Sequence, residues 1–567
     1  MKKGEIAEGV VEKLRFPDQG ILQIEGKKAI VKHVIPGQRI RFRVKKNRAD
    51  RIEGQLVEVL EKAPCELDVP ACPHAGVCGG CTFQSLPYET QLELKGKMVS
   101  DLLGMPEAEV VIADAASSTV QGRPGEVLPV YASPQAAGYR NKMEFTFGDA
   151  YKGGPLTLGQ HKRGGFFDIV DVPDCRIADA DFGAILSATR DFFAERGVPY
   201  YHRMRHEGIL RHLLVRKASK TGEILVDLIA ASGMQDLTEA DGTPMPAAYA
   251  AMLQTLPLQG ILTGVLYTKN DSAADAVRDE GTVVLYGREY FTEELLGLSF
   301  RITPFSFFQT NSGGAEVLYT QVRRMIGALE NDPVVFDLYS GTGTIAQMVA
   351  PTAGKVIGVE IVPEAVEAAR ENAALNGLEN CEFLCGDVLE VLDVIPEKPD
   401  FIILDPPRDG IHPKALAKII AYGVPQMVYI SCKPTSLVRD LEILRKGGYE
   451  MQDICCVDMF PATNHVETVI LLSQRKADAY VEVNLELSDL DLTSAETKAT
   501  YEEIKAYIKE KYDLNVSNLY IAQIKEECGI LERENYNLAK GEDGKKPHCP
   551  IVKRDAILDA FRYFSMI

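Results

Sequence analysis

The chain of 567 residues lacks a long apolar segment. No run of about 18 consecutive apolar residues occurs in it, and residues 1–30 lack the uninterrupted apolar core of a signal peptide. Cysteine is sparse too, because twelve in a chain of this length are too few for a disulfide scaffold. We therefore expect a cytoplasmic protein without a membrane partner, in which clustered thiols hold a metal or take part in chemistry.

Positive charge is scarce over most of the chain. The net charge of −19 argues against nonspecific nucleic-acid binding by the whole surface, since phosphate contacts need lysine and arginine. Residues 1–62 differ, because their nine lysines and six arginines outnumber nine acidic residues and give a net charge of +6. A basic module is thus attached to an acidic body.

Three strand-like stretches make up the basic module. They cover residues 5–14, 19–34 and 38–60 and are separated by glycine and proline turns, a pattern typical of a small β-barrel. Barrels of this size often bind RNA, and composition alone leaves a purely structural role equally open.

The rest of the chain divides into three regions by pattern. Residues 63–300 carry a cysteine-rich loop and then a mainly β pattern, whereas residues 301–475 alternate strictly between strands and helices. That alternation predicts an α/β fold with a doubly wound parallel sheet. Residues 478–567 are helix-rich, and they present an apolar face with Tyr501, Ile504, Tyr507 and Ile508. This last region holds no chemical motif, and its excess of acidic residues favours a protein contact or simple packing.

A glycine turn in the sequence VVFDLYSGTGTIAQMVA, residues 334–350, lies between an apolar strand and a helix. The turn lacks a Walker lysine, so it disfavours phosphate and favours an adenosine that carries a sulfonium group, S-adenosylmethionine. Four acids, Asp337, Glu360, Asp387 and Asp405, end four successive predicted strands. Each alone is equally consistent with a helix cap, but together they outline a pocket at the carboxyl edge of the sheet.

Cys432 follows a fifth strand and precedes a helix that begins near Thr435. A helix N-terminus and Lys433 nearby predict a favoured thiolate. Further along, Glu467 interrupts an apolar segment, and a buried acid is costly unless it has a partner or a function. We interpret the other cysteines of this region as packing residues, namely Cys381, Cys385, Cys455 and Cys456.

A methyl donor, a thiol and a carboxylate together indicate methylation of a pyrimidine at carbon. Uracil C5 is too weak a nucleophile for a sulfonium methyl group, but addition of a thiolate at C6 turns C5 into an enolate carbon. A base must then remove the C5 proton before the thiol is eliminated. Cys432 and Glu467 supply the two protein groups that this chemistry needs.

Six motifs carry a resemblance to a known family. They are AGYRNKMEF (137–145), FFQTN (307–311), DLYSGTGT (337–344), DPPRDG (405–410), SCKPTSL (431–437) and HVETV (465–469). Over residues 1–475 the chain resembles the RNA uracil-5-methyltransferases, specifically the iron-sulfur branch that acts on 23S ribosomal RNA. The resemblance implies a class I Rossmann-like methyltransferase fold with an N-terminal TRAM domain, an RNA-binding β-barrel.

The resemblance also implies site residues. Cys432 matches the nucleophile and Glu467 the proton acceptor. The methyl-donor positions of the family fall on Gln309, Tyr339, Glu360 and Asp405, with Asp387 beside the adenine. Asp405 is expected to reach the uracil as well, because it lies where donor and base meet.

The sequence CPHAGVCGGC, residues 72–81, places three cysteines in a glycine-rich loop. In the family, this spacing joins a distant fourth cysteine to hold a [4Fe-4S] cluster, which here implies Cys72, Cys78, Cys81 and Cys175. Four thiolates suit a cluster and equally suit a structural zinc. Cys65 is nearby but falls outside the family spacing.

The expected reaction forms 5-methyluridine in large-subunit ribosomal RNA, by a monomeric enzyme. The transfer RNA branch of the family typically lacks both the barrel and the cysteine cluster, so the presence of both here favours ribosomal RNA. Transfer RNA is the alternative substrate. An amino-group methyltransferase explains DPPR but leaves Cys432 and Glu467 unused. A non-catalytic RNA-binding protein with a zinc module leaves the acids of the sheet edge unused.

Overall fold

The structure is a computed structural model that describes residues 1–115, 120–165, 167–273, 277–475, 501–512, 514, 516–527 and 550–563. The chain divides into two compact units, Met1–Asp478 and Ala479–Ile567, and each is described by itself. Within the described ranges, no helix has both the length and the apolar character needed to cross a membrane.

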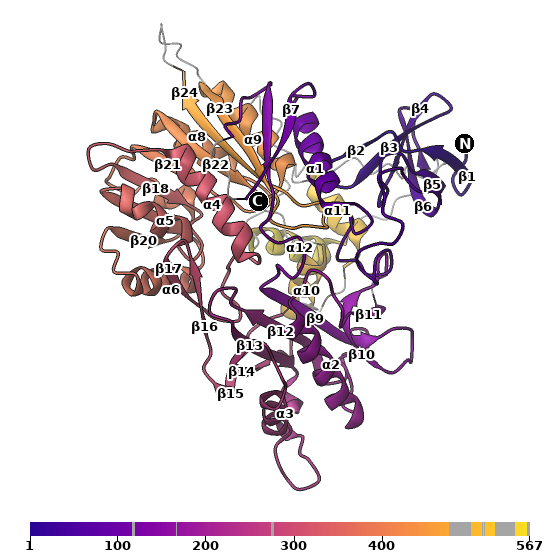
Figure 1. Cartoon of the computed structure of the whole chain (residues 1–567). Coiled ribbons are helices and arrows are strands. Elements are labelled where there is room, and N and C mark those ends of the chain that lie inside the picture. Colours follow the sequence, from indigo (N-terminus) through magenta and orange to yellow (C-terminus); the bar gives the residue numbers. More distant parts are fainter. Residues whose placement is uncertain are drawn as a thin grey trace. The chain divides into compact units, whose positions relative to one another are not determined.

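The first unit begins with a six-stranded sheet in the order β1-β5-β6-β4-β3-β2, drawn in indigo in Figure 1. Alternating apolar residues of its strands, such as Ile40, Phe42 and Val44 of β5, point into a small core of their own. The strands are β1 (Ile6–Val10), β2 (Lys13–Arg15), β3 (Gln19–Ile24), β4 (Lys27–Val31), β5 (Arg39–Asn47) and β6 (Arg51–Glu61).

A second sheet of seven strands follows, in the order β11-β10-β9-β12-β13-β14-β15. Two helices pack on it around Phe182, Phe193 and Tyr249. Its elements are β9 (Lys142–Asp149), β10 (Leu156–His161), β11 (Ile169–Asp171), α2 (Ala180–Glu195), β12 (Leu210–Lys217), β13 (Glu223–Ala230), the 3-10 helix η1 (Ser232–Asp236), α3 (Met245–Gln254), β14 (Ile261–Lys269) and β15 (Thr282–Gly287).

The third sheet has nine strands in the order β20-β19-β18-β21-β22-β24-β23-β8-β7. Short, fully buried apolar runs such as Phe401–Leu404 form its centre, as expected for strands covered on both faces. The strands are β7 (Glu109–Ala113), β8 (Val127–Tyr131), β18 (Val334–Leu338), β19 (Lys355–Glu360), β20 (Cys381–Cys385), β21 (Phe401–Leu404), β22 (Gln426–Ser431), β23 (Tyr449–Val457) and β24 (Glu467–Gln474).

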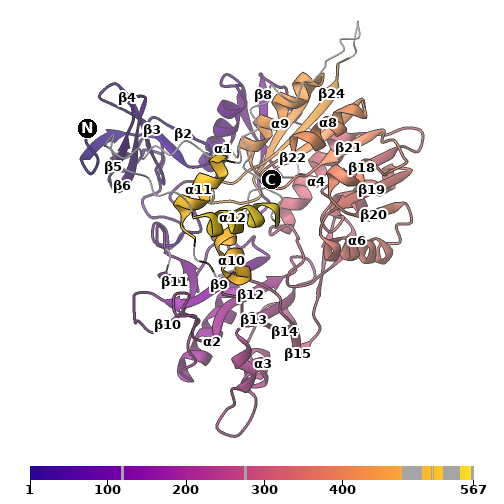
Figure 2. The same cartoon turned by 180° about the vertical axis from the view of Figure 1, so that it is seen from behind.

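Helices cover both faces of the nine-stranded sheet. One core joins it to α1 (Tyr88–Leu102), α7 (Val388–Val391), α8 (Pro413–Ala421) and α9 (Pro434–Lys446). The other core joins it to α4 (Ser312–Ile326), α5 (Thr344–Val349) and α6 (Pro363–Leu375), with the 3-10 helix η2 (Ala350–Thr352) and the hairpin of β16 (Phe291–Leu295) and β17 (Leu298–Ile302). Figure 2 shows the same strands and helices from behind.

Two expectations about this sheet need correction. The sheet is mixed and not wholly parallel, because β24 runs antiparallel to both of its neighbours, whereas all other neighbouring strands of the sheet pair in parallel. The sheet also extends beyond the predicted range 301–475, since β7 and β8 from the preceding region pair in parallel and β8 joins β23. A hairpin connection between β23 and β24 explains the antiparallel pair.

The second unit contains α10 (Tyr501–Tyr512), α11 (Asn518–Glu527) and α12 (Ile551–Tyr563). Ile504 and Ile508 of the predicted apolar face are fully buried and Tyr507 packs beside them, whereas the side chain of Tyr501 lies outside the described residues. Lys511 forms an ion pair of 2.8 Å with Asp559, which links α10 to α12.

Candidate active site

The glycine turn between β18 and α5 forms the first part of the site. Gly341 and Gly343 have φ angles of 54° and 72°, and a Cβ atom at Gly343 would lie 2.6 Å from the Phe383 ring. Glycine is therefore needed at position 343 for both conformation and space. Tyr339 also has a left-handed φ of 69°, an uncommon conformation for a residue with a side chain and one that concentrates at functional sites.

Glu360 ends β19 beside this turn, as predicted. Its two carboxylate oxygens accept hydrogen bonds of 3.0 Å from the Gly341 and Val362 amides. A carboxylate has about four acceptor positions, so the half-buried Glu360 retains capacity for two further donors. The side chain thus both braces the turn and remains able to bind hydroxyl groups.

Asp337 does not end its strand. It lies inside β18, fully buried, and accepts a hydrogen bond of 2.9 Å from the Ala346 amide at the start of α5. Burial raises the pKa of Asp337 to about 8, with a further contribution from nearby Asp405. The expectation of a strand-end acid is wrong here, and Asp337 instead holds the start of α5 through its hydrogen bond to the Ala346 amide.

Asp387 lies at the edge of the pocket. It is exposed and caps α7, where it accepts a hydrogen bond of 2.8 Å from the Leu389 amide. Burial raises the pKa of Tyr339, and the charge of Asp387 raises it further, which places these two residues near each other. Two of the predicted donor-binding residues thus lie together.

Strand pairing brings Cys432 and Glu467 together. Ser431 of β22 pairs with Thr468 of β24 in antiparallel register, so the next residues along the two strands, Cys432 and Glu467, lie opposite each other. Asp405 follows Leu404 of β21, which pairs in parallel with Tyr429 of β22. The three predicted residues therefore meet at one edge of the sheet.

Burial dominates the electrostatics of this group. It raises the pKa of Glu467 to about 8, with a contribution from Asp405, and it raises the pKa of Asp405 to about 7. Both shifts follow from removing a carboxylate from water. A carboxyl group poised near neutral pH is suited to take up and release a proton.

The predicted stabilisation of the Cys432 thiolate is wrong. Burial, followed by the charges of Glu467 and Asp405, raises the pKa of the Cys432 thiol to about 11. Lys433 does not help, because its ammonium group lies 3.5 Å from Asp409 at the surface. The thiol is therefore held in its protonated form until a partner or substrate changes its surroundings.

Two residues near Cys432 and Glu467 were not predicted. The charge of Arg408 lowers the pKa of both Cys432 and Glu467, which opposes part of the effect of burial. Tyr319 of α4 is buried, and its pKa is influenced by the side chains of Gln309, Asp405 and Glu467, which therefore lie near it. The DPPR motif contains Arg408, whereas no local pattern distinguishes Tyr319 from a packing residue of its helix.

The loop that carries Gln309 is tied to the seven-stranded sheet. Asn141 donates hydrogen bonds of 2.8 Å to the Gln309 carbonyl and 2.9 Å to the Ser312 hydroxyl. Asn311 caps α4 by accepting from the Gly314 amide at 2.9 Å. The motifs AGYRNKMEF and FFQTN thus contact each other directly.

Cys72, Cys78, Cys81 and Cys175 line one cavity of about 340 Å³, together with Arg140 and Lys142. Burial raises the pKa of the Cys81 thiol to about 11, and the other three cysteines add to that shift. Cys65 is exposed and does not line the cavity. In the part of the chain that the structure describes, no group of three or more His, Cys, Asp or Glu side chains is arranged to hold a metal ion.

The remaining cysteines near the sheet differ from one another. Cys455 and Cys456 of β23 are fully buried, which confirms the prediction that they are packing residues, and Cys381 is half-buried. Cys385 is exposed at the end of β20, so the packing prediction is wrong for it. Its strand is the edge strand of the sheet, where one side has no neighbour to cover it.

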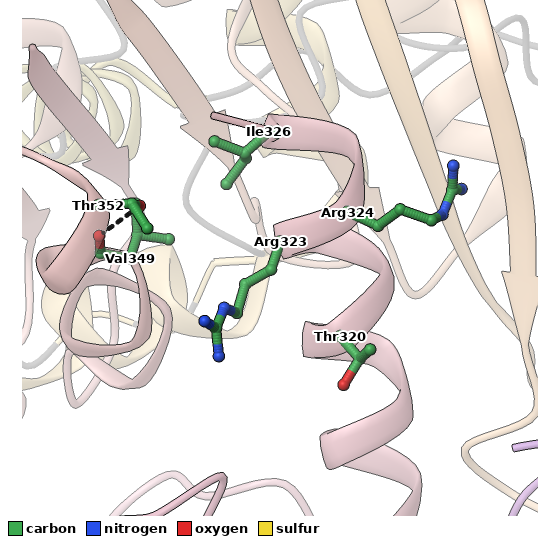
Figure 3. A pocket seen from close by; sticks show the side chains of 7 residues that line it. Thr320, Arg323, Arg324, Ile326, Val349 and Thr352 are labelled. Atoms are coloured by element: carbon green, nitrogen blue, oxygen red, sulfur yellow. Dashed lines mark hydrogen bonds between the residues drawn. The ribbon is translucent and has the colours of Figure 1, made fainter. Parts of the chain in front are cut away.

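A separate cavity of about 420 Å³ lies at the C-terminal end of α4 (Figure 3). Arg324 on its wall pairs with Asp453 at 2.6 Å. None of the predicted site residues lines it; the lining consists of Thr320, Arg323, Arg324, Ile326, Gly327, Val349 and Thr352.

Comparison with known proteins gives consistent results. A family profile described as tRNA (Uracil-5-)-methyltransferase matches residues 276–475. An uncharacterized RNA methyltransferase of Clostridium tetani is 46% identical over 476 residues, which cover 84% of this chain and 99% of that protein. A protein of the same description from Porphyromonas gingivalis is 35% identical, covering 80% and 96%.

One solved structure is similar to this chain over its whole length. It is the tRNA (uracil-54, C5)-methyltransferase of Pyrococcus abyssi in complex with S-adenosyl-L-homocysteine. The TM-score is 0.62 and the identity 26%, with 82% of this chain and 100% of that chain covered.

Proposed function

Because this chain belongs to the RNA uracil-5-methyltransferase family and is a methyltransferase dependent on S-adenosylmethionine, we propose that it methylates C5 of a uridine in 23S ribosomal RNA through a covalent adduct with Cys432. The observation that carries the proposal is the placement of Cys432 opposite Glu467 beside Asp405. This arrangement brings a thiol and two carboxyl groups within reach of one bound ring, which covalent catalysis requires.

The proposed reaction uses each group once. The Cys432 thiol first loses its proton to solvent, and the resulting thiolate adds to uracil C6, so that the electron pair of the C5–C6 double bond moves to C5 and the C4 carbonyl oxygen. C5 then attacks the methyl group of the donor, and the sulfonium sulfur leaves as a neutral thioether. Glu467 accepts the C5 proton, the double bond reforms, and the Cys432 sulfur departs. We assign Asp405, which directly follows β21, to a hydrogen bond with the ring while charge develops on it.

The donor site is the part of the pocket around the glycine turn. We assign the ribose hydroxyls to the free acceptor positions of Glu360, with Tyr339 and Asp387 beside the adenine. We assign Gln309, in the loop that Asn141 holds before α4, to the methionine part of the donor.

Two features favour ribosomal RNA over transfer RNA. One is the basic N-terminal sheet domain of residues 1–62, which we assign as a TRAM domain; the other is the cavity with four cysteines. The Pyrococcus abyssi relative bears a name that states a transfer RNA substrate, which makes transfer RNA the alternative.

The proposed substrate is tested by mass spectrometry of RNA from a strain that lacks the gene. We expect loss of 5-methyluridine from 23S ribosomal RNA, restored by the wild-type gene but not by a Cys432→Ala gene. Loss confined to transfer RNA would replace the ribosomal assignment with the alternative, and no loss in either RNA would refute the proposed reaction.

The four cysteines that line one cavity are the residues that would hold a metal cluster. Four thiolates suit a [4Fe-4S] cluster, and the sequence resemblance implies the same four residues. We therefore assign Cys72, Cys78, Cys81 and Cys175 to a [4Fe-4S] cluster. Thr82 and Phe83 directly follow Cys81, so the cluster would also hold this part of the chain in place.

Protein purified without air is expected to be brown and to contain about four irons per chain, because four thiolates bind one such cluster. Elemental analysis and the visible spectrum measure this directly. Cys78→Ser should lose the metal and much of the soluble yield, whereas Cys65→Ser, a matched change at an exposed thiol outside the cavity, should lose neither. Zinc in place of iron in the anaerobic protein would contradict the assignment.

A further inference from the structure

The connection between β23 and β24, residues 458–466, leads directly into Glu467. Val457, the last residue of β23, pairs with Glu467, the first residue of β24. The connection therefore ends directly at Glu467, the proposed base, so a displacement of the connection would also move Glu467. We refer to residues 458–466 as the connecting loop.

Side chains and amides from other segments hold the connecting loop at four successive carbonyls. Each donor comes from a different part of the chain, so the loop is fixed from several sides. The Met459 carbonyl accepts from Asn311 at 2.9 Å, the Phe460 carbonyl from Lys95 at 3.0 Å, the Pro461 carbonyl from Tyr139 at 2.9 Å, and the Ala462 carbonyl from the Thr82 and Phe83 amides at 3.0 and 2.9 Å.

A buried ion pair anchors the start of the connecting loop. Lys95 of α1 lies 2.6 Å from Asp458, and neither side chain is exposed to solvent. Such a pair contributes little net stability, but removing one partner is costly because the other charge stays buried. The pair therefore fixes one specific arrangement of α1 and the loop.

Ala462 is the strained point of the connecting loop. Its φ of 66° lies in the left-handed region, which costs a residue with a side chain free energy. Its amide donates to Gln91 at 2.7 Å, and its carbonyl accepts from Thr82 and Phe83. Strain of this kind persists only where the surroundings impose it. The connecting loop therefore depends for its shape on α1 and on residues 72–83, which we call the cysteine loop.

The segment that holds Ala462 belongs to the same stretch of chain as the cysteines that line the cavity. Thr82 and Phe83 directly follow Cys81. Tyr139 packs with Ala462 in a small cluster that also contacts Cys81 and Cys175. A change in the conformation of the cysteine loop thus reaches the connecting loop through the two amides and the Tyr139 hydroxyl.

We propose that the connecting loop positions Glu467, and that the cysteine loop, through Thr82, Phe83 and Tyr139, holds it in that position. The inference rests on the proposed roles of Glu467 and Cys432. The cysteine loop then acts selectively on proton removal from C5 and leaves addition of Cys432 and methyl transfer largely unchanged. Tyr139 is in this sense a positioning residue.

Tyr139→Phe removes one hydrogen bond from the connecting loop and keeps the ring in place. We expect release of the methylated RNA to slow roughly tenfold to a hundredfold, the scale of loss from misplacing a catalytic group by about 1 Å, while methyl transfer in a single turnover stays within about twofold of wild type. A methylated covalent adduct should then accumulate during turnover, which denaturing gels and labelled donor measure.

Tyr449→Phe is the matched control. Tyr449 is also buried and donates a hydrogen bond of 2.9 Å to a backbone carbonyl, that of Val424. It begins β23, opposite Gln474 and away from Glu467. This variant should lose similar stability without accumulating adduct.

A second pair of variants changes Thr463, a residue of the connecting loop itself. The Thr463 hydroxyl donates to the Phe460 carbonyl at 2.8 Å and accepts from the His465 amide at 3.2 Å. Thr463→Ala should accumulate adduct, and Thr463→Ser, which keeps the hydroxyl, should restore release.

The outcomes separate this inference from the proposed function. If Glu467→Gln traps the adduct but both Tyr139→Phe and Thr463→Ala release product at the wild-type rate, the positioning role is wrong and the base assignment stands. If Glu467→Gln itself releases product normally, the base assignment is wrong as well. Equal slowing of methyl transfer and release would also overturn the inference, because it indicates a general structural effect.

Discussion

Replacing Cys432 with alanine is expected to abolish methyl transfer to RNA, with a loss on the order of a millionfold, the scale that removing a covalent nucleophile causes. Without addition at C6, C5 never becomes nucleophilic enough to attack the methyl group. The variant should therefore show neither methylated RNA nor a protein band shifted by RNA on a denaturing gel. Binding of the donor should persist, because the proposed donor site is formed by the glycine turn and Glu360 and does not include Cys432.

Cys65→Ala serves as the control for loss of a thiol, since Cys65 is exposed and lines neither the active site nor the cysteine cavity. It should retain full activity. Turnover by Cys432→Ala, or an adduct of the wild-type enzyme that peptide mapping assigns to Cys455 or Cys456, would show that the nucleophile lies elsewhere. Both of those thiols are fully buried in β23.

The strands from β18 to β22 could be predicted from the sequence. The apolar strand before the glycine turn is β18, Glu360 ends β19, and Cys432 follows β22, all as expected. These strands are buried on both faces, so a short apolar run followed by a turn and a helical pattern identifies each of them locally.

The two strands at the other edge of the sheet, β7 and β8, could not be predicted in the same way. β7 and β8 precede the seven-stranded sheet in sequence and still join the edge of the nine-stranded one. Strand partners that lie more than 300 residues apart leave no local pattern, because the pairing depends on packing formed by the whole unit. The predicted boundary at residue 300 therefore followed the change in pattern and missed these two strands.

The grouping of Cys432, Glu467 and Asp405 at one edge of the sheet was predictable from the sequence, but the electrostatics of the group were not. The predicted thiolate rested on Lys433 and the start of a helix. Burial and two neighbouring acids outweigh both.

Glu467→Gln is expected to stop the reaction after methyl transfer. Glutamine keeps the size of the side chain, so addition of Cys432 and attack of C5 on the methyl group can proceed. It cannot accept the C5 proton, so elimination stalls and the enzyme remains bound to methylated RNA. The measurement is a shifted band on a denaturing gel that carries label from the methyl donor, in an amount that approaches one adduct per enzyme.

The pH dependence of product release provides the decisive control for this variant. Burial and Asp405 raise the pKa of Glu467 to about 8, so the fraction of ionised base falls about tenfold for each pH unit below that value. Release by the wild-type enzyme should therefore rise with pH up to about 8 and then level off. The residual release by Glu467→Gln should lack this rise, because the amide does not titrate. A variant that kept the same rise would show that another group removes the proton, with Asp405, whose pKa burial raises to about 7, as the next candidate.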